Sequence, residues 1–120
     1  MKQNLNFSLI QSNIFWENAD KNLLHFEKLI SKISETDIIL LPEMFNTAFC
    51  PKSNHLAEKM EGKTISWMKE ISKQQNCSIA GTLMVIENNK VFNRLVWISE
   101  NGEIHTYDKH HLFSLIKEER

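Results

Sequence analysis

The chain has 120 residues, of which 42% are hydrophobic and three are glycine, and its formal charge is −1. This size and composition are typical of one ordered globular domain, or part of one. Its interspersed charges give no electrostatic basis for binding nucleic acid or an anionic membrane. No apolar stretch reaches the roughly 18–20 residues of a membrane span. The amino terminus turns polar too soon for a secretory signal, so we expect a cytoplasmic protein.

The first half of the chain predicts a strand–helix–strand unit. Alternating polar and apolar residues predict a strand at 6–11. Asn18 can cap a helix, in which apolar residues recur every three or four positions over 19–33. The apolar run 38–41 predicts a second strand at 37–41, which Pro42 ends because proline cannot donate to a sheet ladder. Such a unit favours parallel strands whose carboxyl ends lie at the same edge of the sheet.

The second half predicts a helix and then three strands joined by tight turns. A long loop at 46–63 leads to a helix that Thr64 can cap. Gly81 marks a bulge or a close backbone approach in the first of the three strands. The three strands are predicted at 78–86, 91–99 and 103–107. This order predicts an α/β fold in which a mixed sheet has two helices on one face.

Charged side chains follow two of the predicted strands. Glu43 comes directly after the second strand, within the string LLPEMF. Lys109 comes just after the last strand, within the string YDKHHLF. In open α/β sheets ligands bind at the carboxyl ends of the strands, although each residue alone is also typical of a solvated strand end.

The two strings, in this order and at this separation, resemble the nitrilase superfamily of carbon–nitrogen hydrolases, and within it the ω-amidase branch. The resemblance runs from the first strand to Arg120. It implies that residues 1–120 are the N-terminal portion of a single domain and form half of an αββα sandwich. It also implies a Glu-Lys-Cys active site that hydrolyses small ω-amides such as 2-oxoglutaramate. The family's cysteine lies in a later strand-end motif, beyond the point where this chain stops, so we expect the isolated chain to be inactive.

The resemblance also implies roles for individual residues. Glu43 is expected to be the general base, and Lys109 to stabilise the oxyanion of a tetrahedral intermediate. Glu118 resembles a second glutamate that orients the lysine or the substrate, with Glu119 as the alternative. Three residues are expected to line the substrate pocket: Phe45, Thr47 and Phe49.

The cysteines and histidines present offer weaker alternatives. Cys50 lies in a loop without a suitable base and orienting group, and Cys77 is most simply a small buried hydrophobe. His110 and His111 would point to opposite faces of an extended strand, and no further residue completes a metal-binding spacing. We therefore expect no metal and no cofactor, and a small-molecule amide as the substrate.

A second, non-catalytic interpretation stays open from the sequence. The chain can also be read as a catalytically inactive α/β module that self-associates or binds a partner. Half a sandwich exposes an apolar sheet face, and exposed apolar faces and open edges drive association. Members of the superfamily commonly dimerise, so a homodimer is the expectation for the intact enzyme.

Overall fold

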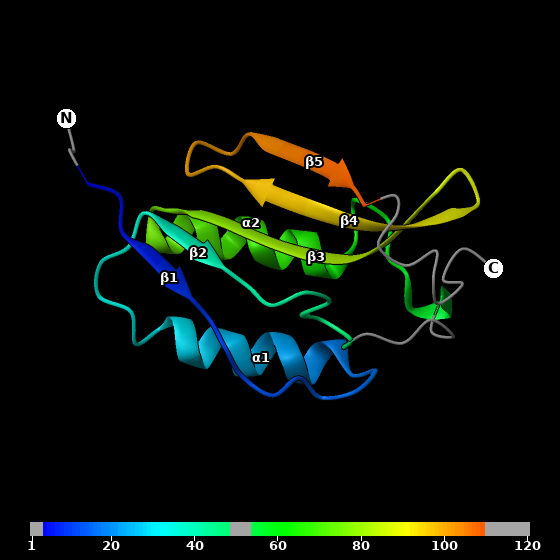
Figure 1. Ribbon diagram of the computed structural model, residues 1–120, viewed down its shortest axis with the longest axis horizontal. Coiled ribbons are helices and arrows are strands. Elements are labelled where there is room, and N and C mark those ends of the chain that lie inside the picture. Colours follow the sequence, from blue (N-terminus) through cyan, green and yellow to red (C-terminus); the bar gives the residue numbers. More distant parts are fainter. Residues whose placement is uncertain (1–3, 49–53, 110–120) are drawn as a thin grey trace.

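The structure, a computed structural model, describes residues 4–48 and 54–109. These residues form a five-stranded sheet with two α-helices (Figure 1). In chain order the elements are β1 (Phe7–Leu9), α1 (Ala19–Ile30), β2 (Ile38–Leu40), a short 3-10 helix η1 (Asn54–Leu56), α2 (Lys63–Gln75), β3 (Ser78–Glu87), β4 (Lys90–Ile98) and β5 (Ile104–Asp108).

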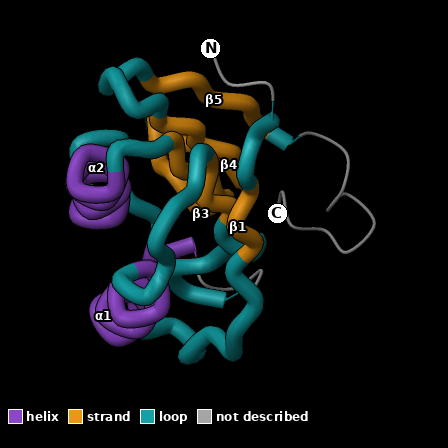
Figure 2. The backbone as a smooth tube through the Cα atoms, turned by 90° about the vertical axis from the view of Figure 1, so that its left-hand side faces the viewer, coloured by secondary structure: helices purple, strands orange, loops and turns teal. Residues whose placement is uncertain are grey.

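The sheet is mixed, as the sequence predicted, and its strands follow chain order from β1 to β5. The pairs β1–β2 and β2–β3 are parallel, whereas β3–β4 and β4–β5 are antiparallel. Both helices lie on the same side of the sheet (Figure 2). The predicted α/β architecture with two helices on one face is therefore confirmed.

The core lies between the helices and one face of the sheet. Phe45 has no solvent exposure, and its ring centroid lies 6.1 Å from those of Phe26 in α1 and Trp67 in α2. The other buried apolar residues of this core include Ile30, Ile39, Ile65, Met68, Ile71, Ile79, Leu83, Val85, Val96 and Ile98. Their burial fixes which face of each strand points toward the helices, since side chains alternate along a strand.

The opposite face of the sheet is exposed at its two edge strands, whereas Ala80, Met84 and Asn93 in its middle are buried. Phe7 and Leu9 flank Ser8, whose register partner Ile39 points into the core, so both point away from the helices. Tyr107 lies on the same open face, and the three side chains are between 55% and 68% exposed. This apolar face is consistent with half of a two-layer sandwich.

The two helices begin differently. Asn18 caps α1, as predicted, because its side chain accepts a hydrogen bond of 3.1 Å from the amide of Lys21. The predicted cap at Thr64 is wrong, since the N-cap of α2 is Gly62 and Thr64 is buried in the first turn. Instead, the carboxylate of Glu58 accepts the amide hydrogen of Thr64 at 2.8 Å. Within the described ranges, neither helix is long and apolar enough to cross a membrane.

Candidate active site

Glu43 lies in a turn that directly follows β2. Just before it, the amide of Leu41 donates to the carbonyl of Ala80 at 2.8 Å, which continues the pairing with β3. Just after it, Met44 has a left-handed backbone conformation with φ of 52°. The amide of Met44 donates to the hydroxyl of Thr82 at 2.8 Å. The turn that carries Glu43 is thus attached to β3 on both sides of the carboxylate.

Lys109 directly follows β5, and its side chain reaches the carboxylate of Glu43. Its backbone amide donates to the carbonyl of Asn93 at 2.9 Å, which extends the β4–β5 ladder by one residue. Its ammonium donates to Oε2 of Glu43, and the two side chains form an ion pair although they lie 66 residues apart in sequence. The pair is partly open to solvent, with 26% of the Lys109 side chain and 43% of the Glu43 side chain exposed.

Asn93 completes the group and was missed from the sequence. Its Nδ2 donates a long hydrogen bond of 3.4 Å to Oε2 of Glu43, the same oxygen that Lys109 contacts. Asn93 is only 5% exposed, and its Oδ1 is buried without a hydrogen-bond partner among the described residues. Buried amide atoms are rarely left unpaired, which marks this position as specialised. The available signal was a polar residue within the apolar strand β4.

The structure brings together two of the predicted site residues, Glu43 and Lys109. Phe45 is fully buried on the helix side of the sheet, and Thr47 is 2% exposed near the start of α1. That these two line a substrate pocket stays a prediction. The other predicted or weighed positions lie outside the described residues: Phe49, Cys50, His110, His111, Glu118 and Glu119.

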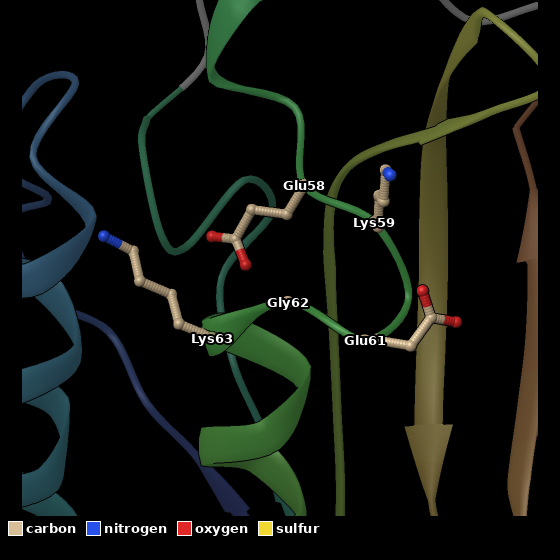
Figure 3. Close-up of a pocket in the computed structure, with 5 residues that line it drawn as sticks. All are labelled: Glu58, Lys59, Glu61, Gly62 and Lys63. Atoms are coloured by element: carbon tan, nitrogen blue, oxygen red, sulfur yellow. The ribbon is translucent and has the colours of Figure 1, made fainter.

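Two open depressions lie beside the first turn of α2, away from the ion pair. One, of about 380 Å³, is lined by Glu58, Lys59, Glu61, Gly62 and Lys63 (Figure 3). The other, of about 350 Å³, is lined among others by Thr47 and His55. In Figure 3 the carboxylate of Glu58 lies above the start of α2, whereas Lys59 and Glu61 extend from the other side of the loop. Neither depression is lined by Glu43 or Lys109.

The remaining ionisable groups give no second catalytic cluster in the part of the chain described. No group of three or more His, Cys, Asp or Glu residues there is arranged to hold a metal ion. Cys77 is 1% exposed, and burial, with smaller contributions from Glu100 and Asp37, raises the pKa of its thiol from about 9 to about 11. A thiol with a raised pKa is a poor nucleophile at neutral pH. This agrees with reading Cys77 as a core residue.

Comparison with known proteins assigns the chain to a family. The sequence model of the carbon-nitrogen hydrolase family matches residues 7–120. The chain belongs to this family. The match covers both strand-end motifs, so Glu43 and Lys109 lie within the family region.

The relatives include several bacterial amidases. The chain is 31% identical to the omega-amidase YafV of Escherichia coli and 33% identical to that of Yersinia enterocolitica, in each case over 95% of this chain. It spans 44% of the length of each of these relatives.

Solved structures have the same fold. XC1258 from Xanthomonas campestris, a CN-hydrolase superfamily protein solved with an arsenic adduct in its active site, superimposes with a TM-score of 0.92 at 30% identity. That match covers 98% of this chain and 44% of XC1258. An N-terminal amidase superimposes with a TM-score of 0.83 over 95% of this chain and 30% of its own, at 21% identity. The expected nitrilase-type fold is thereby confirmed.

Proposed function

We propose that this chain supplies the general base and the oxyanion-stabilising lysine of an amidase acting on a small ω-amide similar to 2-oxoglutaramate. Glu43 and Lys109 are the two groups, and the family resemblance implies a cysteine nucleophile from a motif after Lys109. Neither Cys50 nor Cys77 matches that motif. We further propose a cytoplasmic homodimer as the active form.

The geometry fits a thioester mechanism. The Glu43 carboxylate removes the thiol proton, and the sulfur forms a bond to the amide carbon. The carbonyl oxygen gains negative charge, which the Lys109 ammonium stabilises. The tetrahedral intermediate breaks its C–N bond, and Glu43 returns the proton to the departing ammonia. Glu43 then removes a proton from water, which attacks the thioester and releases the carboxylic acid and the thiol.

The observation that carries this proposal is the direct contact between Lys109 and Glu43 on the open side of the sheet. A base and a cation that act on the same carbonyl group must lie within a few ångströms of each other. Here that arrangement is built by three separate elements, namely the turn after β2, the middle of β4 and the end of β5. The similarity to bacterial omega-amidases supports the choice of an ω-amide as substrate.

Ammonia release from 2-oxoglutaramate tests the proposal. The enzyme preparation is the natural gene product that contains this sequence, and the 120-residue chain is assayed beside it. We expect hydrolysis by the gene product and none by the 120-residue chain. Turnover by the 120-residue chain that is lost when Cys50 is alkylated would contradict the assigned nucleophile. Absence of turnover on any small ω-amide by the gene product would contradict the amidase.

The open apolar face supports the second candidate, a non-catalytic module that self-associates. Phe7 and Leu9 on edge strand β1 and Tyr107 on edge strand β5 are each more than half exposed on the side of the sheet opposite the helices. Exposed apolar side chains and open sheet edges of this kind promote association. Sedimentation of the 120-residue chain at several concentrations tests this candidate. Concentration-dependent association that Phe7→Ser and Leu9→Ser abolish would support it, and a stable monomer would contradict it.

A further inference from the structure

Two neighbouring residues of β4, Asn93 and Arg94, bind the last two described residues of the chain. The backbone carbonyl of Asn93 accepts the amide hydrogen of Lys109 within the β4–β5 ladder, and the Asn93 side chain contacts the Glu43 carboxylate on the face opposite the helices. On the helix face, Arg94 binds the carboxylate of Asp108. Because side chains alternate along a strand, fixing Asp108 on one face directs Lys109 to the other.

The contact between Arg94 and Asp108 is a bidentate ion pair. Nε of Arg94 donates to Oδ1 of Asp108 at 2.6 Å, and Nη2 donates to Oδ2 at 3.0 Å. The Arg94 side chain is 8% exposed and its guanidinium lies 5.1 Å from the ring centroid of Phe92. Paired bonds of this kind fix orientation as well as distance. The hydrogen bonds that Arg94 donates to Asp108, and with a smaller effect the one to Glu87, raise the pKa of Arg94 above its ordinary value, and burial partly opposes them.

Strand β5 is held in register by its ladder with β4, which begins at the Asn101-Gly102 turn and ends at the pair of Arg94 and Asp108. Among the described strands it is an edge strand that pairs with β4 alone, and its residues from Ile104 to Tyr107 are exposed. A slip of one residue would turn every side chain of the strand to the other face, and Lys109 would then point away from Glu43. The Arg94–Asp108 ion pair opposes this slip at the position next to Lys109.

We propose that Arg94 and Asp108 are positioning residues that hold the Lys109 ammonium against the Glu43 carboxylate. This inference rests on the proposed amidase function for its catalytic consequence, but its structural part can be measured without turnover. Arg94 and Asp108 meet on the helix side of the sheet, whereas Glu43 and Lys109 meet on the other side. The effect of Arg94 and Asp108 passes through the backbone of residues 108 and 109.

Glu87 provides a matched control. Its Oε1 accepts a hydrogen bond of 2.8 Å from Nη1 of Arg94, so it is the second acidic partner of the same guanidinium. Glu87 is the last residue of β3, beside the β3–β4 turn, and its side chain is half exposed. Its hydrogen bond joins β3 to β4 and does not involve β5. Glu87→Gln therefore weakens the charge cluster and leaves the Asp108 contact in place.

The first measurement is made on the 120-residue chain by nuclear magnetic resonance. With lysine and glutamate selectively labelled, Overhauser contacts between Lys109 Hε and Glu43 Hγ report the ion pair directly. We expect Arg94→Met and Asp108→Asn to lose these contacts while the core resonances persist, and Glu87→Gln to retain them. Unchanged contacts in folded Arg94→Met and Asp108→Asn would overturn the proposal. Loss of the folded core in both variants would also overturn the proposal, because the ion pair would then serve the overall stability of the fold and not the position of Lys109.

The second measurement is kinetic and uses the natural gene product. A displacement of about 1 Å in a catalytic group costs on the order of 10²-fold in rate. We expect Asp108→Asn to lower kcat about 10- to 100-fold with KM within twofold, and Glu87→Gln to keep both constants. A gene product without amidase activity would refute the proposed function. The Overhauser contacts would then still decide whether Arg94 and Asp108 position Lys109. An active enzyme with unaltered kcat in Asp108→Asn would overturn the positioning role alone.

Discussion

A β-carbon added to Gly81 would lie 2.8 Å from Cδ1 and Cε1 of the Phe45 ring. The same atom would lie 3.1 Å from Cβ of Leu41, which is also close to the contact limit. Gly81 therefore lets the segment after β2 pack directly on β3. Since Glu43 lies between Leu41 and Phe45, this close approach helps to place the carboxylate over the sheet.

Gly81→Ala should destabilise the fold by about 1–3 kcal/mol, because an extra methyl group in a packed core forces its neighbours to move. Phe45→Leu removes the ring that the new methyl group would meet. The double variant should then be more stable than the sum of the two single effects, as expected for residues in contact. Chemical denaturation of the four proteins measures this coupling. Strictly additive losses would contradict the packing described.

Thr82→Val should impair catalysis more than stability. The substitution keeps the shape of the side chain but removes the hydroxyl that accepts the amide of Met44, next to Glu43. One net hydrogen bond is worth about 1 kcal/mol. We expect kcat of the natural gene product to fall about tenfold and Thr82→Ser to restore it. Equal activity of the Val and Ser variants would show that this bond does not position Glu43.

Glu58→Ala should destabilise the chain by about 1–2 kcal/mol through loss of the α2 cap. Its Oε1 accepts the amide of Thr64 at 2.8 Å, and its Oε2 accepts the Thr64 hydroxyl at 2.5 Å. Glu61→Ala is the matched control, since Glu61 lines the same depression and extends away from the helix start (Figure 3). Thermal unfolding compares the two. Equal losses would mean that general charge effects, and not the cap, account for the change.

Cys77 should make the fold sensitive to alkaline pH. Its pKa is raised by burial to about 11 in the folded chain, against an ordinary value of about 9. At a pH between these two pKa values the unfolded chain has lost the thiol proton and the folded chain keeps it. The free energy of unfolding therefore falls as the pH rises. The slope contributed is at most about 1.4 kcal/mol per pH unit. Cys77→Ala should remove this component in denaturant titrations between pH 8 and 11, and identical slopes would contradict it.

Much of the fold could be predicted because hydrophobic periodicity and turn residues mark it locally. Asn18 is followed by a helical repeat, and Asn101-Gly102 separates two strands, so element type and order follow from neighbouring residues. The start of α2 could not be predicted in this way. Its cap comes from Glu58, six residues before Thr64, and Glu58 is held in place by bridging to Val85 of β3.

The site was predictable only where a residue follows a strand. Glu43 and Lys109 stand at strand ends within strings that resemble one family, so the sequence indicated both. Asn93 and Arg94 lie inside β4, where alternation shows that they face opposite ways but not which partners they meet. Their partners are 50 and 14 residues away in sequence, and only the folded sheet brings them together.

The most direct test of the central claim is the activity of Glu43→Gln and Lys109→Met in the natural gene product. Loss of a general base or of an oxyanion-stabilising group typically costs about 10²- to 10⁴-fold in rate. We predict a fall in kcat of that order for each variant on 2-oxoglutaramate. The double variant should be little worse than either alone, because the two groups act on the same intermediate. Lys90→Met, at the start of β4, is the control and should retain full activity. Near-normal kcat in Glu43→Gln or Lys109→Met would contradict the assignment.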